Sequence, residues 1–169
     1  GSMNNRFEQA FAEKCGAKYA ITFNSGTSTL HAGLVALDVN AGDEVIVPPL
    51  TVVSNIDVIF AQNAIPVFAD INPDTFNIDP ADVRRKMTSR TKCIMPVSLY
   101  GLSADLDPIM QIAKEHGIGV INDAAEAFGT LYKGRQIAQI ADITSYSTEN
   151  SKHITTGDGG IIVTNNEDY

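Results

Sequence analysis

The sequence predicts an α/β fold built on a mainly parallel sheet. Short runs rich in β-branched residues alternate along the chain with segments of helical periodicity. Several of these runs are almost continuously apolar, as strands are when helices cover both faces of a sheet. The chain has 169 residues, of which 44% are hydrophobic and 19% charged, a composition that suits one soluble domain with a sizeable core.

Seven segments are expected to be strands. The first three are KYAITF at 18–23, EVIVPP at 44–49 and IPVFAD at 65–70. The other four are TKCIMPVSLY at 91–100, GVINDA at 119–124, ITSYS at 143–147 and GIIVTN at 160–165. No repeat, low-complexity segment or linker interrupts this pattern, so we expect a single domain over residues 1–169.

Three helices between these strands carry recognisable signals. DPADVRRKM begins at Asp79-Pro80 and DPIMQIAKEHG begins at Asp107-Pro108. In each, we expect the aspartate to cap free backbone N–H groups, and proline suits the first helical position. Gly117 is expected to end the second of these helices. In TLHAGLVALDV, one helical face carries Leu30, Leu34 and Leu37.

Composition and charge exclude several classes of function. The net charge of −8, with no basic cluster beyond RRK at 84–86, argues against a surface for nucleic acid or anionic membranes. No apolar run approaches a membrane span, no secretory signal is recognisable, and we interpret the opening GSM as an expression scar. Cys15 and Cys93 lack CxxC spacing and are expected to be reduced packing thiols in a cytoplasmic protein. The three histidines show no metal-ligand spacing.

Polar residues follow three of the predicted strands. NSGTST follows the first strand, Asp123 ends the fifth, and Ser147 ends the sixth with Lys152 close behind. Ligands of parallel α/β sheets bind beyond the carboxyl ends of the strands. We therefore expect these three points, which are distant in sequence, to converge in space.

The first of them, FNSGTSTLHAGL, has the pattern of a strand, a turn of small residues and a helix. Gly26 lets the backbone turn tightly and approach a ligand. Thr27 and Ser28 offer N–H and hydroxyl donors at a helix N-terminus, where the dipole favours an anion such as phosphate. The alternative is a helix capped by Ser or Thr with no ligand. The segment is neither a Walker A loop nor a GxGxxG fingerprint.

Asp123 and Lys152 each allow two interpretations. A carboxylate at the end of a buried strand needs a partner, which is either a protonated ring nitrogen or the backbone N–H groups of a following helix. Taken alone, Lys152 is expected to be an exposed surface lysine. It can also form a Schiff base with a carbonyl cofactor, provided that the site lowers its pKa. A phosphate cradle, an aspartate and a lysine nucleophile are together what pyridoxal 5'-phosphate (PLP) requires.

With these motifs in place, the chain resembles the DegT/StrS-type sugar aminotransferases, which are PLP enzymes of fold type I. The matching stretches cover nearly the whole chain in the family's order. They are NSGTSTLHAGL, GDEVIVPPLTVVS, AIPVFADINPDTFNIDP, LYGLSADLDPIMQIAKEHGIGVINDAAEAFG and YSTENSKHITTGDGGIIVTN. The resemblance implies a three-layer sandwich around a mostly parallel seven-stranded sheet whose last strand is antiparallel.

The resemblance also implies roles for matching residues. Lys152 would be the Schiff-base lysine and proton shuttle, and Asp123 would pair with the pyridine nitrogen. Glu126 lies where the family often has Gln, His or Glu near the ring hydroxyl of the cofactor. Some relatives carry His at the lysine position and perform dehydration, so Lys152 favours transamination. The phosphate would be held by Thr27, Ser28 and Ser147, with Gly26 making room.

Two substitutions depart from the family pattern. Val52 stands where the family commonly has an aromatic residue stacked on the cofactor ring. Thr148 replaces the second Phe of the FSF that often precedes the lysine. The chain is also much shorter than family members, and we expect it to be the central part of a large domain without the N-terminal segment and the small domain.

Two functions follow as expectations. The first is transfer of an amino group, from L-glutamate, to a keto group of a nucleotide-linked sugar by a homo-oligomer. The second is a truncated, non-catalytic module that keeps the fold and lacks activity. Other fold-type-I reactions, such as sugar dehydration or cyclitol amination, remain open because a fold does not fix its chemistry.

Overall fold

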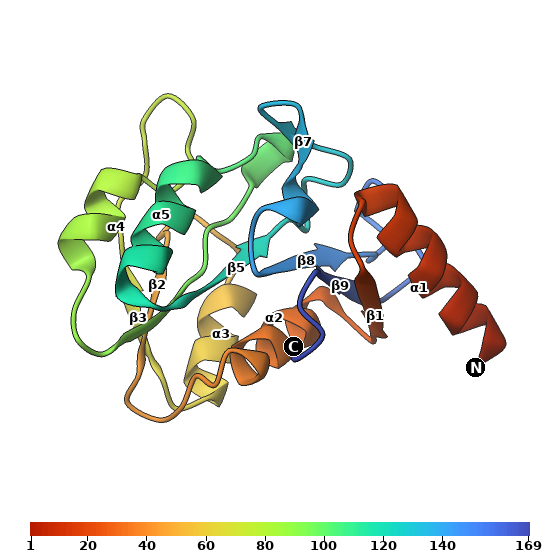
Figure 1. Cartoon of the computed structure of the whole chain (residues 1–169), viewed down its shortest axis with the longest axis horizontal. Coiled ribbons are helices and arrows are strands. Elements are labelled where there is room, and N and C mark those ends of the chain that lie inside the picture. Colours follow the sequence, from red (N-terminus) through yellow and green to blue (C-terminus); the bar gives the residue numbers. More distant parts are fainter.

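A sheet of seven strands between two layers of helices forms the body of the molecule (Figure 1). The computed structural model describes residues 1–169. The spatial order of the strands is β1-β9-β8-β5-β4-β2-β3. Only β9 runs against the others, since it pairs antiparallel with both β1 and β8 while the remaining pairs are parallel. The predicted fold class, including the antiparallel last strand, is confirmed.

All seven predicted strands are present, each inside its expected range. Their bounds are Tyr19–Phe23 (β1), Glu44–Val47 (β2), Ile65–Phe68 (β3), Thr91–Ile94 (β4), Gly119–Asp123 (β5), Ile143–Ser147 (β8) and Gly160–Thr164 (β9). The run expected at 91–100 is the least accurate, because the strand stops at Ile94. Pro96 follows two residues later and has no N–H to donate to a ladder. The chain then forms a short 3-10 helix, Leu99–Gly101.

Helices cover both faces of the sheet. On one face lie α2 (Gly26–Ala36) and α3 (Ser54–Ala61). On the other lie α1 (Ser2–Cys15), α4 (Pro80–Lys86) and α5 (Leu106–His116), together with a small hairpin of β6 (Leu131–Tyr132) and β7 (Arg135–Gln136) and a 3-10 turn at Ile137–Gln139. None of these helices is long and apolar enough to cross a membrane.

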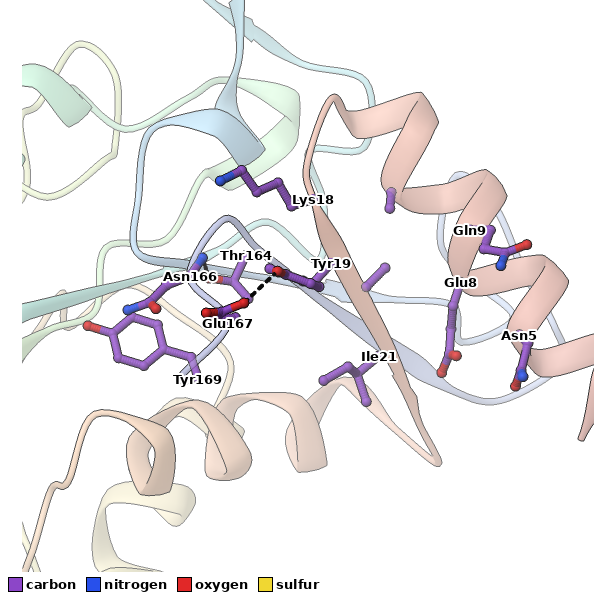
Figure 2. A pocket seen from close by; sticks show the side chains of 12 residues that line it. Asn5, Glu8, Gln9, Lys18, Tyr19, Ile21, Thr164, Asn166, Glu167 and Tyr169 are labelled. Carbon is purple, nitrogen blue, oxygen red and sulfur yellow. Dashed lines mark hydrogen bonds between the residues drawn. The ribbon is translucent and has the colours of Figure 1, made fainter.

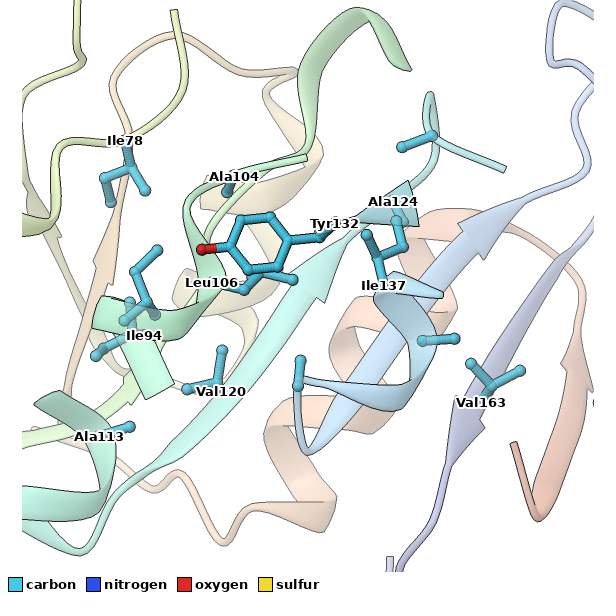
Figure 3. Close-up of a cluster of buried hydrophobic side chains, with 14 of the residues drawn as sticks. Ile78, Ile94, Ala104, Leu106, Ala113, Val120, Ala124, Tyr132, Ile137 and Val163 are labelled. Atoms are coloured by element: carbon cyan, nitrogen blue, oxygen red, sulfur yellow. The ribbon is translucent and has the colours of Figure 1, made fainter. Parts of the chain in front are cut away.

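Each helical layer packs its own hydrophobic core on the sheet. The core beneath α1, α4 and α5 is the larger, and Figure 3 shows part of it around Tyr132. The predicted leucine face of α2 is confirmed, because Leu30, Leu34 and Leu37 are all buried in the other core. Complete burial of one such side chain contributes about 1.5–3 kcal/mol.

The two predicted aspartate caps have different outcomes. Asp79 caps α4 as expected, accepting a 2.9 Å hydrogen bond from the Ala81 N–H. The prediction for Asp107 is wrong, because α5 begins at Leu106 and Asp107 lies inside its first turn. The hairpin provides the physical reason: Lys133 Nζ and Arg135 Nη2 bind the Asp107 carboxylate at 2.8 and 2.6 Å. Gly117 ends α5 in the left-handed conformation, as predicted.

Candidate active site

A cavity of about 330 Å³ opens where the carboxyl ends of β1, β5 and β8 meet the first turns of α2 and α3. Serine, threonine and charged side chains dominate its lining. Six of the eight predicted site residues lie on it: Gly26, Thr27, Val52, Asp123, Ser147 and Lys152. The convergence expected from the sheet topology is therefore present. The other two predicted residues, Ser28 and Glu126, do not line the cavity.

The N-terminus of α2 forms one wall. Ser25 caps the helix, because its Oγ accepts the Ser28 N–H at 3.1 Å. Ser28 uses its hydroxyl in the same turn, donating to Asn24 Oδ1 at 2.6 Å. This explains why Ser28 does not face the cavity. Thr27 does face it and donates from Oγ1 to Ser54 Oγ at 3.1 Å, which links the first turns of α2 and α3.

Two glycines allow this wall to approach the sheet. A Cβ on Gly26 would lie 2.9 Å from Ser147 Cβ, closer than carbon atoms pack. A Cβ on Gly160, the first residue of β9, would lie 2.5 Å from the Ser25 carbonyl oxygen. The sequence therefore brings the free N–H groups of α2 against Ser147 by omitting side chains at both contacts.

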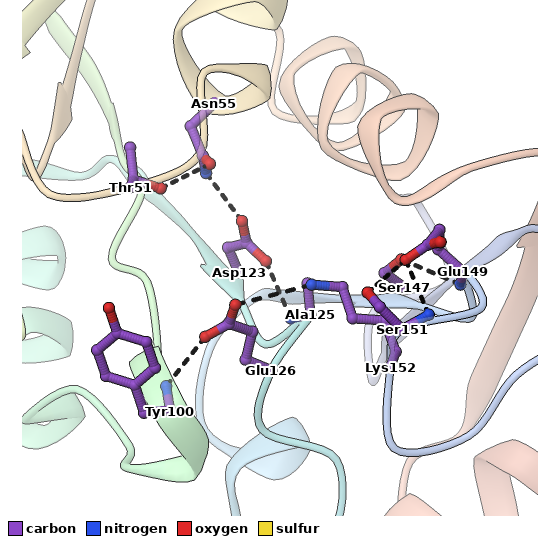
Figure 4. Close-up of polar contacts among 10 residues, drawn as sticks. All are labelled: Thr51, Asn55, Tyr100, Asp123, Ala125, Glu126, Ser147, Glu149, Ser151 and Lys152. Carbon is purple, nitrogen blue, oxygen red and sulfur yellow. Dashed lines mark hydrogen bonds and ion pairs between the residues drawn. The ribbon is translucent and has the colours of Figure 1, made fainter.

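Asp123 is buried at the end of β5, with 2% of its surface exposed. Its Oδ1 accepts the Ala125 N–H at 3.0 Å and its Oδ2 accepts from Asn55 Nδ2 at 2.9 Å (Figure 4). No helix follows it, so capping of a helix does not account for this carboxylate. Burial raises the pKa of Asp123, while the Ala125 N–H, the Asn55 amide and the nearby Lys152 ammonium oppose that rise.

Lys152 points toward Asp123 and Glu126 across the cavity (Figure 4). Its side chain is 24% exposed, and Nζ lies 3.7 Å from Glu126 Oε1. Glu126 Oε2 in turn accepts the Tyr100 N–H at 3.1 Å. The interpretation of Lys152 as an ordinary exposed surface lysine does not fit this placement.

The loop that carries Lys152 is closed by Thr148, which is 2% exposed. Thr148 N donates to Gly159 O at 2.9 Å, Thr156 N donates to Thr148 O at 3.0 Å, and the two threonine hydroxyls lie 2.8 Å apart. The threonine at this position therefore fastens both ends of the loop. A phenylalanine could not make the hydroxyl contact.

Sequence reasoning missed several polar residues of the site. Ser25, Ser54, Ser145, Glu149 and Asp158 line the cavity, and Asn55 contacts Asp123 from behind. The one available signal was a pair of polar residues, Thr51 and Asn55, four positions apart in the apolar stretch LTVVSNIDVIF. Their partner is distant in sequence, and spacing alone does not identify it.

A second hollow, of about 350 Å³, lies between α1, β1 and the residues after β9 (Figure 2). Its one hydrogen bond between labelled side chains joins the Tyr19 hydroxyl to Glu167 Oε2 at 3.3 Å. None of the predicted site residues lines it. The cavity at the strand ends is therefore the candidate site.

The chain is similar to known proteins of one aminotransferase family. Residues 1–169 match the DegT/DnrJ/EryC1/StrS aminotransferase family. A GDP-perosamine synthase of Caulobacter vibrioides is 48% identical over 162 residues, covering 96% of this chain and 44% of that protein. The structure of an aminotransferase from Psychrobacter cryohalolentis superposes with a TM-score of 0.97 at 42% identity, covering 99% of this chain and 43% of the other.

A further solved structure that resembles the chain is that of a protein in its PLP form. The sugar aminotransferase Spr1654 from Streptococcus pneumoniae, described as putative and in its PLP form, superposes with a TM-score of 0.94 at 32% identity, covering 100% of this chain and 47% of the other. The chain thus spans less than half the length of the relatives that it matches.

Proposed function

The chain belongs to the DegT/DnrJ/EryC1/StrS aminotransferase family, and on that premise we propose that its cavity is the PLP site of a sugar aminotransferase. The observation that carries the proposal is the meeting of Lys152, Asp123 and the α2 N-terminus with Ser147 on a single cavity. Each of these matches one group of the cofactor. The primary amine matches the carbonyl, the buried carboxylate matches the ring nitrogen, and the anion donors match the phosphate.

The residues present fit the cofactor. Thr27 and Ser147 offer hydroxyls beside the N–H groups of α2, where a phosphate is favoured by the helix dipole. Two further carboxylates, Glu149 and Asp158, line the same cavity. Each is bound by its own loop: Glu149 Oε2 accepts from the N–H and hydroxyl of Ser151, and Asp158 Oδ1 accepts the Gly159 N–H. Both carboxylates therefore have hydrogen-bond donors within their own loop.

The roles of the chain's own residues follow from this placement. When bound, PLP supplies an electron sink for the carbon that loses its proton. Asp123 would hold a proton at the ring nitrogen, because its ionised oxygens have only two neutral donors and are left able to accept a third. Lys152 Nζ would bond the cofactor carbonyl and carry the proton to and from the substrate carbon. Glu126, 3.7 Å away, would orient that amine.

We infer transamination, with L-glutamate as donor and a nucleotide-linked keto-sugar as acceptor. This is supported by the GDP-perosamine synthase and the putative sugar aminotransferase among the relatives, and by a lysine rather than a histidine at position 152. We further propose a homo-oligomer, because Val52, Val53 and Tyr100 leave large apolar side chains exposed beside the cavity. A cytoplasmic location is consistent with two free, buried cysteines.

The test is the donor half of the reaction. The protein is loaded with PLP and given L-glutamate, and 2-oxoglutarate is measured by a coupled assay, with Lys152→Ala as the inactive control. Formation of 2-oxoglutarate, followed by amination of an added nucleotide-linked keto-sugar, supports the proposal. Stable PLP binding without either product favours the alternative of a non-catalytic module.

A further inference from the structure

A chain of side-chain hydrogen bonds reaches Asp123 from behind the cavity. Thr51 Oγ1 donates to Asn55 Oδ1 at 2.8 Å, and Asn55 Nδ2 donates to Asp123 Oδ2 at 2.9 Å (Figure 4). The second N–H of the same amide faces Met95 Sδ, with Nδ2 and Sδ 3.4 Å apart. Asn55 is completely buried in the first turn of α3. It does not line the cavity, so it has no direct route to a ligand.

The orientation of the Asn55 amide is fixed by the Asp123 carboxylate and satisfied by the Thr51 hydroxyl. An ionised carboxylate only accepts hydrogen bonds, so the amide must turn Nδ2, not Oδ1, toward Asp123. Oδ1 then needs a donor, and the Thr51 hydroxyl supplies one. With the opposite orientation, two oxygens would face each other in a buried place, which is costly. The carboxylate therefore selects the amide orientation, and the Thr51 hydroxyl, which can donate as well as accept, satisfies Oδ1 in that orientation.

Asp123 has few other sources of stabilisation for its charge. The charged groups that act on it are Lys152, which lowers its pKa, and Glu126, which raises it. The remaining support comes from the Ala125 N–H and the Asn55 amide. Since hydrogen bonds to the charged form of a buried carboxyl favour ionisation, loss of the Asn55 donor shifts the balance toward the protonated acid.

We propose that Asn55, held in place by its hydrogen bond from Thr51, is a positioning residue that holds the Asp123 carboxylate ionised and in one rotamer for the proton at the ring nitrogen of the cofactor. This role rests on the proposed function, because it assigns the free face of Asp123 to PLP. The Thr51–Asn55 pair itself is defined by contacts of the chain alone.

The test uses two variants and a matched control. Asn55→Leu removes the donor to Asp123 at similar side-chain size. Thr51→Val removes only the hydroxyl that donates to Asn55 Oδ1, which leaves the amide less firmly held. The control is Thr144→Val, which removes a completely buried hydroxyl that has no hydrogen-bond partner. Thr144 pairs with Asn122 in the ladder and so lies on the opposite face of the sheet from Asp123.

Two quantities are measured for each protein. The first is the titration of the Asp123 carboxyl in the cofactor-free protein, followed by carbon-13 NMR with labelled aspartate and assigned with Asp123→Asn. The second is PLP affinity, from absorbance titration. We expect Asp123 to titrate at higher pH in Asn55→Leu and Thr51→Val, with PLP affinity about tenfold lower in Asn55→Leu. Thr144→Val should change neither quantity.

The outcomes separate this proposal from the proposed function. An Asp123 titration that is unchanged in both variants overturns the positioning role, even if PLP affinity falls. If the Asp123 titration shifts in the variants but the protein binds no PLP, Thr51 and Asn55 still set the charge of Asp123. In that case the assignment of the cavity to the cofactor is refuted. If Asn55→Leu does not fold, Thr51→Val decides, because it keeps the shape of the side chain and leaves Asn55 in place.

Discussion

Replacing Gly26 with alanine should separate α2 from the sheet at the phosphate end of the cavity. The new Cβ would lie 2.9 Å from Ser147 Cβ and 3.2 Å from Ser147 Oγ. Carbon atoms in contact lie about 3.5–4.0 Å apart, so the helix terminus and Ser147 must move apart by roughly 0.6–1 Å. Overpacking of this kind costs about 1–3 kcal/mol. The higher helix propensity of alanine offsets about 1 kcal/mol at most.

The expected net effect of Gly26→Ala is a loss of about 1 kcal/mol of stability, which lowers Tm by roughly 2–4 °C for a chain of this size. The same displacement moves Ser147 Oγ away from the N–H groups of α2. Because both would bind one phosphate, PLP affinity should fall by about tenfold or more. Circular dichroism during heating gives Tm, and absorbance titration gives the affinity.

The control for Gly26→Ala is Gly119→Ala at the start of β5. Its Cβ would lie 2.5 Å from Leu37 Cδ1, so it also overpacks the fold. Gly119 does not line the cavity. We expect a lower Tm with unchanged PLP affinity. If Gly26→Ala binds PLP as tightly as the wild type, the close approach of α2 to β8 does not form the phosphate end of the cavity. If its Tm is unchanged, position 26 does not pack closely against Ser147.

Two further predictions concern titratable groups outside the site. Burial raises the pKa of Cys15 to about 11 and that of Cys93 further. At pH 8 a thiol reagent should therefore label neither cysteine until urea unfolds the chain. Rapid labelling of the native protein would contradict this prediction. The Thr88 hydroxyl and the Arg90 guanidinium hold the pKa of Glu44 below its ordinary 4.5. Glu44 therefore stabilises the fold fully above pH 4.5 and loses this effect as the pH falls. Urea unfolding of Glu44→Gln should show about 1–3 kcal/mol of destabilisation at pH 7 that shrinks toward pH 3, and a pH-independent difference would contradict it.

Much of the fold could be predicted because burial on both faces gives the strands nearly continuous apolar runs, such as GIIVTN around β9. The prediction failed where tertiary contacts override local signals. Asp107 has the local pattern of a cap, yet two cations of the hairpin bind it. Helix α3 is only eight residues long, and Val53 at its N-cap makes no side-chain capping bond. The sequence therefore carries no start signal for this helix.

The convergence of the site was predictable for a topological reason. Parallel strands end at the same edge, so residues that follow β1, β5 and β8 had to meet there. The supporting residues were not predictable in this way. Asn55 acts on Asp123 from 68 positions away, and no spacing rule connects them. Ser28 was predicted to bind the phosphate, but its hydroxyl donates to Asn24 in its own turn. A serine at the start of a helix can therefore form local hydrogen bonds and not face a ligand.

The most direct test of the account is chemical trapping at Lys152. The protein is incubated with PLP, reduced with borohydride, digested and analysed by mass spectrometry, beside Lys152→Ala treated in the same way. We predict one dominant pyridoxyl adduct on Lys152 in the wild-type protein and its loss in the variant. Absence of an adduct, or adducts scattered equally over many lysines in both proteins, would contradict the assignment of this cavity as a PLP site.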